Sequence, residues 1–132
     1  MKNKYNITAW CVLLWIAATS FKPGQPPKNY RYVDGSAYTV LDSTDFYLYQ
    51  RYEPQAAVKG AATVMKNEYF FSRDGRSRIE PLTLSNLEKV FAPNARFRYS
   101  LEAHFCRNED LISFDPFLKE YKIKYLYTQS LQ

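Results

Sequence analysis

Histidine and cysteine are scarce in this sequence. His104 is the single histidine, and Cys11 and Cys106 are the two cysteines. These residues cannot make a zinc site without added carboxylates, and no calcium-loop spacing is present. The sequence also lacks a Gly-rich phosphate loop, a G-x-S-x-G elbow and an H-E-x-x-H motif. We therefore expect no metal site and no cofactor.

Tryptophan occurs only near the start of the chain, within residues 7–18, an uncharged and mostly apolar run. Lys2 and Lys4 precede the run, and the small residues Ala18 and Ser20 lie where a signal peptidase site would. A positive start, a short apolar run and small residues at a cleavage position are the three parts of a secretory signal peptide. The sequence therefore predicts a cleavable signal peptide over the first 20 residues.

Export would place the mature chain in the periplasm or outside the cell. The apolar run is shorter than the roughly 20 residues that span a bilayer, so we expect no membrane span after cleavage. An uncleaved N-terminal anchor remains the alternative. Residues 21–29 are polar and Pro-rich and predict a flexible lead-in. Residues 30–132 are enough for a single small domain.

The charge balance is only mildly basic. The formal net charge of the chain is +5, and removal of Lys2 and Lys4 lowers it to +3. Such a balance does not argue for nucleic acid and leaves a protein or an envelope component as the expected partner. With one cysteine left, no internal disulfide can form; Cys106 is expected to be buried as a small apolar side chain, or else to join two chains. The oligomeric state stays open.

Turn residues and alternating apolar positions predict strands in the first half of the domain. Asp34-Gly35 is a turn signal between two short strands. Asp74-Gly75 predicts a two-residue type I′ hairpin turn, because both turn positions need positive φ. The predicted strands span residues 30–33, 37–41, 46–51 and 63–73, with a return strand over 76–80.

Short helices are expected after Pro81. Thr83 is a good N-cap for a helix that begins at Leu84, and Asp115-Pro116 is a good start for a later one. The further predicted helices span residues 95–105, 109–114 and 117–121, and residues 122–127 are expected to form a final strand or an extended tail. The pattern predicts an α+β fold, an antiparallel β-meander or hairpin sheet followed by three or four short helices packed on it.

Three residues of the predicted 46–51 strand are candidates for a binding surface. Tyr47, Tyr49 and Arg51 share one face of that strand. If this face is open, the three side chains make a flat aromatic patch suited to a partner or a glycan. If helices cover it, they belong to the core. The sequence leaves both alternatives open.

Cys106 and His104 are the candidates for catalysis. A thiol nucleophile needs a base within hydrogen-bond reach. Side chains two positions apart on a helix point in well-separated directions. The pair can therefore act together only if the helix has ended by Phe105.

The chain from Glu68 onward combines a strand, a turn centred on Gly75, a return strand and short helices. The stretches concerned are Tyr69 to Gly75, Pro81 to Leu87, a helix that ends near His104, and Glu109 to Ile112. In these stretches the chain resembles a loose group of small exported proteins of Bacteroidetes-type bacteria. The helices of that group tend to be Lys-rich, whereas residues 84–105 hold one lysine, Lys89. The resemblance implies an exported domain and supplies no catalytic residue.

Two functional hypotheses remain at this point. The first is an exported, non-catalytic domain that binds a protein or an envelope component. The second is an enzyme or redox protein that depends on Cys106, which requires a thiol with a depressed pKa.

Overall fold

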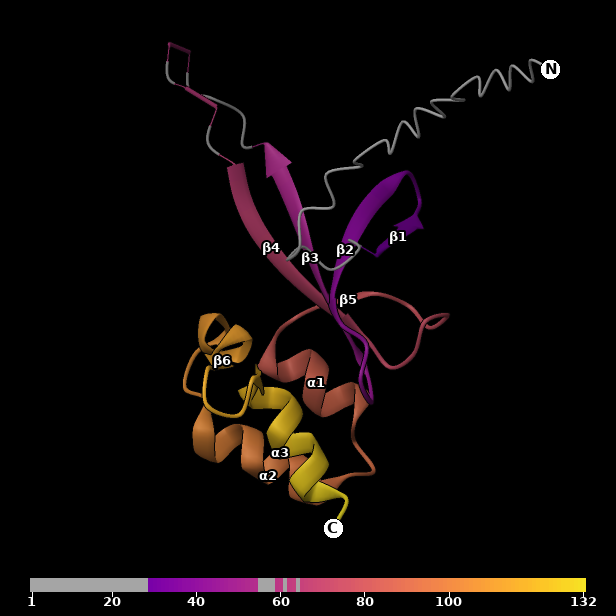
Figure 1. Ribbon diagram of the computed structural model, residues 1–132, viewed down its shortest axis with the longest axis vertical. Coiled ribbons are helices and arrows are strands. Elements are labelled where there is room, and N and C mark those ends of the chain that lie inside the picture. Colours follow the sequence, from indigo (N-terminus) through magenta and orange to yellow (C-terminus); the bar gives the residue numbers. More distant parts are fainter. Residues whose placement is uncertain (1–28, 55–58, 61, 64) are drawn as a thin grey trace, which may run out of the picture.

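The computed structural model describes residues 29–54, 59–60, 62–63 and 65–132. The predicted signal peptide and all but the last residue of the lead-in lie outside the described residues. An antiparallel five-stranded sheet is followed by short helices, which confirms the α+β class (Figure 1). The strands of the sheet, which are adjacent in chain order, are β1 (Tyr30–Val33), β2 (Ser36–Asp42), β3 (Tyr47–Pro54), β4 (Met65–Ser72) and β5 (Glu80–Pro81).

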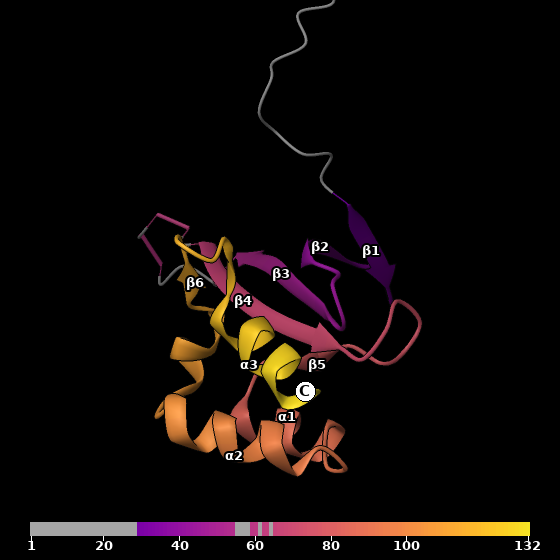
Figure 2. The same cartoon turned by 60° about the horizontal axis from the view of Figure 1, so that its bottom comes forward.

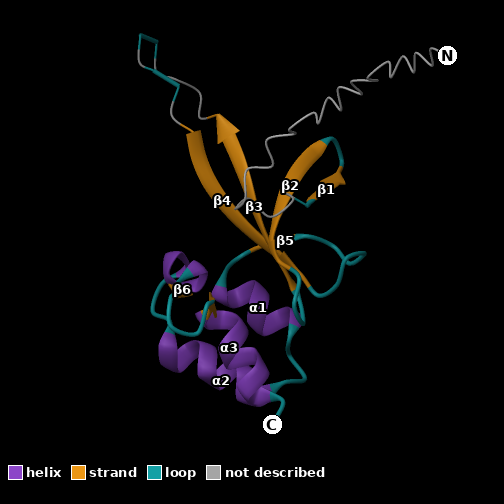
Figure 3. Cartoon of the chain, in the orientation of Figure 1, coloured by secondary structure: helices purple, strands orange, loops and turns teal. Residues whose placement is uncertain are grey.

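Most of the five-stranded sheet extends away from the helices, which gather at the other end of the molecule (Figure 3). The helices are α1 (Leu84–Val90), α2 (Ala95–His104), the 3-10 helix η1 (Asn108–Ile112) and α3 (Lys122–Ser130). A separate two-stranded hairpin, β6 (Phe114–Asp115) and β7 (Glu120–Tyr121), precedes α3. Among the described residues, no helix is both long enough and apolar enough to cross a membrane.

The first hairpin turn forms as its sequence predicts. Asp34 has φ of 49° and Gly35 has φ of 77°, so both central positions adopt the positive φ that a type I′ turn requires. Val33 pairs directly with Ser36 across this turn. The short Asp-Gly turn therefore sets the register of β1 against β2.

The second Asp-Gly pair does not form the predicted type I′ turn. The Asp74 carboxylate accepts the backbone N–H groups of Arg76 at 2.8 Å and Ser77 at 2.7 Å. These two hydrogen bonds lower the pKa of Asp74, and Gly75 does not adopt a positive φ. Residues 73–79 form a wider loop, and the predicted return strand is reduced to the two-residue β5.

Side-chain caps start the first two helices. The Thr83 hydroxyl accepts the Asn86 N–H at 3.2 Å at the start of α1, which confirms the predicted cap. The Asn94 side chain accepts the Phe97 N–H at 3.0 Å at the start of α2. Each cap satisfies a backbone donor that lacks a partner within the helix.

The predicted helix over residues 117–121 is wrong. The Asp115 carboxylate does accept the N–H groups of Phe117 and Leu118, at 2.8 and 3.1 Å. The turn ends at once, because Lys119 adopts φ of 56°, outside the helical region. The chain then returns as β7 beside β6.

The final segment is a helix, so the predicted strand or extended tail over residues 122–127 is also wrong. Ile123 and Leu126 are buried, and Tyr127 packs against the same core. Positions three and four apart lie on one side of a helix. Burial of that side against the rest of the core favours the helical period over the alternating period of a strand.

The main core lies between one face of the sheet, here called the helix face, and the helical layer. Leu48 and Phe71, which pair across β3 and β4, define this face. In Figures 1 and 2 the three α-helices gather at one end of the sheet, and the strands extend beyond them. The buried residues of this core are Phe46, Leu48, Phe71, Leu82, Leu87, Phe91, Phe97, Leu101, Phe105, Leu111, Ile123 and Leu126.

Candidate functional site

The opposite side of the sheet, here called the far face, is closed by the curl of the sheet itself. Arg31 on β1 donates hydrogen bonds to the Tyr49 hydroxyl at 2.9 Å, to Ser72 at 3.1 Å and to the Ser77 carbonyl oxygen at 2.6 Å. One side chain of the first strand thus reaches the end of β4 and the loop that follows it. The curl covers the centre of the far face without a helix.

The predicted binding residues Tyr47, Tyr49 and Arg51 lie on this far face. Tyr49 is fully buried beside Tyr38 and Phe70. Tyr47 and Arg51 are half-buried on either side of it. The three therefore do not form an exposed aromatic patch. The curled sheet covers them, whereas the sequence analysis considered only an open face or cover by helices.

Arg51 is held in an ion-pair network at the rim of the far face. Its guanidinium donates to Glu68 at 3.0 Å, lies 2.7 Å from Glu53, and donates to the Tyr38 hydroxyl at 3.1 Å. It also stacks 4.8 Å from the centroid of the Phe70 ring. Burial opposes the charged form, but the hydrogen bond to Glu68 and the nearby carboxylates raise the pKa of Arg51. These contacts give Arg51 a structural role.

Cys106 and His104 lie at the end of α2, and both are exposed. The helix ends at His104, as a catalytic pair would require, but the His104 Nδ1 lies 2.9 Å from the Ser100 carbonyl oxygen. In residues 65–132, no hydrogen bond joins His104 to Cys106. The expectation that Cys106 is buried is wrong, because Phe105 occupies the core position beside it.

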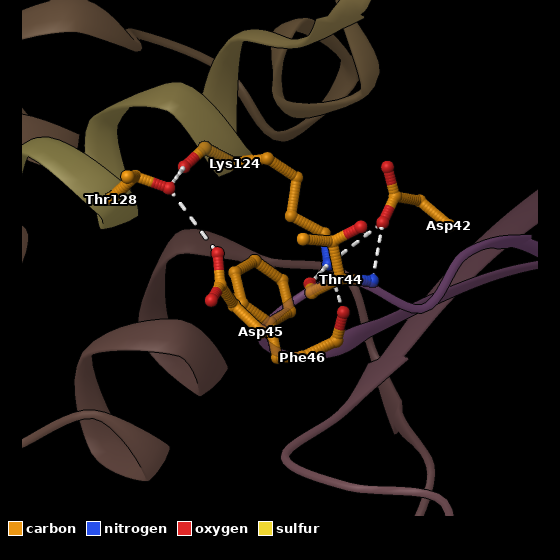
Figure 4. A network of polar contacts seen from close by, with 6 residues as sticks. All are labelled: Asp42, Thr44, Asp45, Phe46, Lys124 and Thr128. Atoms are coloured by element: carbon orange, nitrogen blue, oxygen red, sulfur yellow. Dashed lines mark hydrogen bonds and ion pairs between the residues drawn. The ribbon is translucent and has the colours of Figure 1, made fainter.

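Among the described residues, Lys124 is a buried charged residue that the sequence analysis did not single out. The Lys124 side chain is only 2 % exposed. Its ammonium group donates to the carbonyl oxygens of Thr44 and Phe46 and lies 3.3 Å from an Asp42 carboxylate oxygen (Figure 4). A bulge after Val40 turns Asp42 to the helix face. Burial lowers the pKa of Lys124, and Asp42 opposes this shift only in part. The enclosed ammonium group ties α3 to the β2–β3 connection and is out of reach of a substrate.

The helix face is open where the strands extend beyond the helices. Tyr30 of β1 pairs with Thr39 of β2, which in turn pairs with Gln50 of β3, so all three lie on the helix face. Tyr32 and Tyr52, two positions further along β1 and β3, lie on the same face. Tyr32 and Tyr52 are 74 % and 55 % exposed. We call this area the tyrosine surface; its residues are Tyr30, Tyr32, Ala37, Thr39, Gln50 and Tyr52.

The tyrosine surface contains a hollow of about 510 Å³. None of the described side chains that line it is charged, although 23 % of the residues of the chain are charged. Aromatic rings and uncharged polar groups remain as the chemistry of this surface. Its lining residues are Tyr30, Ala37, Thr39, Leu41, Gln50 and Tyr52.

The sequence contained a signal for part of this surface. Tyr30 and Tyr32 alternate within the predicted first strand, so they had to share a face. Tyr52 lies beyond the predicted end of its strand at Arg51, whereas β3 continues to Pro54. Only the folded chain shows which part of the sheet the helices leave uncovered.

No family model, curated protein or solved structure matches this chain. In the part of the chain that the structure describes, no group of three or more histidine, cysteine, aspartate or glutamate residues is placed to hold a metal ion. Function must therefore be argued from the surface chemistry of the chain itself.

Proposed function

We propose that this chain is an exported, non-catalytic binding domain that contacts its partner through the tyrosine surface. The single observation that carries the proposal is the set of exposed tyrosines around an uncharged hollow on the helix face. Tyrosine combines a large apolar ring with a hydroxyl that hydrogen-bonds a partner, which is why it is enriched in interfaces. A protein or an envelope component fits this chemistry.

Site-specific crosslinking in the native cells tests the surface. A photoreactive phenylalanine analogue is introduced at Tyr52, and the adduct is identified by mass spectrometry. Tyr99 on α2 is a matched control, because it is 68 % exposed, against 55 % for Tyr52, but lies away from the tyrosine surface. We expect a discrete adduct from position 52 and none from position 99. The absence of an adduct at 52, or the same adduct at both positions, would refute this surface.

Export is proposed from the charged start, apolar run and small residues of the first 20 positions. The intact mass of the native protein, measured after separation of envelope and soluble fractions, tests it. We expect a chain that begins at Phe21 in the soluble fraction. A mass that retains Met1 in the membrane fraction would instead indicate an uncleaved anchor.

The alternative hypothesis, chemistry at Cys106, gains no support from contacts to His104. A thiol reagent gives a direct test, because the thiolate is the reactive form. We expect Cys106 in the native protein to react at neutral pH no faster than a cysteine in a free peptide. Faster labelling would favour the enzyme or redox hypothesis.

A further inference from the structure

One position of the five-stranded sheet is left empty beside β4. β5 pairs with Phe70 and Phe71, and the Leu82 N–H donates to the Tyr69 carbonyl oxygen at 2.9 Å. The chain then leaves the sheet, because Thr83 begins α1. Among the described residues, nothing pairs with the outer edge of β4 before Tyr69.

The backbone groups at this edge can be assigned from the antiparallel pattern. Alternate residues of a strand direct their N–H and C=O groups to the same neighbour. Because the backbone C=O group of Tyr69 points to the outer side of β4, the backbone groups of Asn67 and Met65 point there as well. Two N–H groups and two C=O groups therefore face the position that β5 would have occupied had it continued.

A groove of about 470 Å³ follows the same edge. It is lined on the far face by Arg51 and Glu68 and on the helix face by Asn67 and Tyr69. Thr83 and the first residues of η1, Asn108 and Glu109, also line it. Side chains on both faces of the sheet thus flank the open backbone. This arrangement matches binding sites in which an extended peptide adds a strand to a sheet.

We infer that the β4 edge binds an extended segment of another polypeptide as a short additional strand. Lys66 and Glu68 lie two positions apart on the same face, with Lys66 Nζ 3.6 Å from Glu68 Oε1. Opposite charges in directly facing positions stabilise paired strands. Glu68 is already paired with Arg51 at 3.0 Å, whereas the Lys66 side chain is 56 % exposed. The bound segment therefore carries an acidic residue opposite Lys66.

The groove and the hollow of the tyrosine surface share no lining residue, although Asn67 is the cross-strand neighbour of Tyr52. The test uses random peptides about ten residues long, the upper end of strand lengths in proteins, selected against the full chain. The selected peptides are labelled, and their affinities are measured by fluorescence anisotropy. Hydrogen exchange of the backbone amides then locates the bound peptide.

Asn67→Pro removes the outward N–H from the centre of the edge, and proline is tolerated on edge strands. Asn67→Ala is its matched control, because it keeps both backbone groups. We expect Asn67→Pro to weaken peptide binding at least about tenfold, or 1.4 kcal/mol, and Asn67→Ala to change it less than about threefold. Bound peptide is expected to protect the amides of Met65 and Asn67, and Tyr99→Ala on α2 to leave the affinity unchanged.

Equal binding to wild type and Asn67→Pro, protection elsewhere, or failure to select any peptide would overturn the inference. A dimer in sedimentation that Asn67→Pro dissolves would also overturn it, since the occupant would then be a second copy of this chain. Circular dichroism and the thermal midpoint establish that both variants fold.

Discussion

At the scale of single residues, Lys124 differs most from its sequence context. It belongs to a stretch with Lys122 in which both lysines look suited to solvent, yet Lys122 is exposed and Lys124 is buried. A buried charge is tolerated only when it is paired and hydrogen-bonded. Asp42 and two backbone carbonyl groups meet that requirement.

Replacement of Lys124 by methionine removes one partner of a buried ion pair and leaves Asp42 and two carbonyl groups without their donor. We expect Lys124→Met to lower the free energy of unfolding by about 3–5 kcal/mol, measured by urea denaturation. Lys89→Met is the control, because Lys89 is exposed on α1; it should change stability by less than about 0.5 kcal/mol. Equal effects of the two substitutions would show that Lys124 is not buried.

The pKa of Lys124 also predicts a pH dependence. Burial lowers this pKa in the folded chain. Between the folded value and the ordinary lysine value of about 10.4, the unfolded chain binds the proton more tightly, so the stability contributed by Lys124 rises with pH. The stability of wild type relative to Lys124→Met should therefore increase through this alkaline range. A pH-independent difference between the two would contradict the shift.

At the scale of elements, the two Asp-Gly pairs show how neighbours decide a turn. Asp34-Gly35 lies between strands that pair up to the turn itself. Asp74-Gly75 is followed by Arg76 and Ser77, whose N–H groups bind the Asp74 carboxylate. The same dipeptide therefore forms a type I′ turn once and a carboxylate-capped loop once.

The glycines of these two turns should respond differently to alanine. Gly35→Ala places a side chain at φ of 77° and should cost about 1–2 kcal/mol. Gly75 has no positive φ, and an added Cβ would lie 3.3 Å from the Tyr47 hydroxyl oxygen, at the end of a side chain that can shift. Gly75→Ala should therefore cost less. Urea denaturation of both variants gives the order, and the reverse order would mean that the turn types are misassigned.

For short elements, the local sequence predicted where a helix starts better than whether a segment is a helix or a strand. The Thr83 cap rests on one side chain and the next turn of backbone, and it was predicted correctly. Residues 122–127 fit both an alternating strand and a helix, because six residues are too few to separate the two periods. Contacts of Ile123 and Leu126 with a distant core decided for the helix.

At the scale of the whole molecule, Phe46 joins the sheet to the helical layer. Its ring centroid lies 6.5 Å from that of Phe71 on β4, 5.2 Å from that of Phe91 after α1, and 5.4 Å from that of Tyr127 on α3. The same ring lies 3.9 Å from the Lys124 ammonium group. Loss of this one side chain affects both layers at once.

Phe46→Ala is expected to cost about 3–5 kcal/mol, a large part of the roughly 5–15 kcal/mol that stabilises a typical domain. Phe117→Ala is the control, because Phe117 is 94 % exposed; it should change stability by less than about 0.5 kcal/mol. Thermal unfolding followed by circular dichroism compares them. A small effect of Phe46→Ala would mean that the helices are not packed on the sheet as described.

The sequence by itself determined the α+β class, the first four strands, the Asp34-Gly35 turn and the start of α1. These features depend on residues close together in the chain, through alternation, turn conformation and capping. Only the tertiary structure decided that Tyr49 is buried, that Lys124 is enclosed and that the tyrosine surface is open. Each of these depends on distant segments, as in the contact of Lys124 with Thr44, 80 residues away. Local patterns constrain the backbone, but the solvent exposure of a side chain is set by whatever segment packs against it.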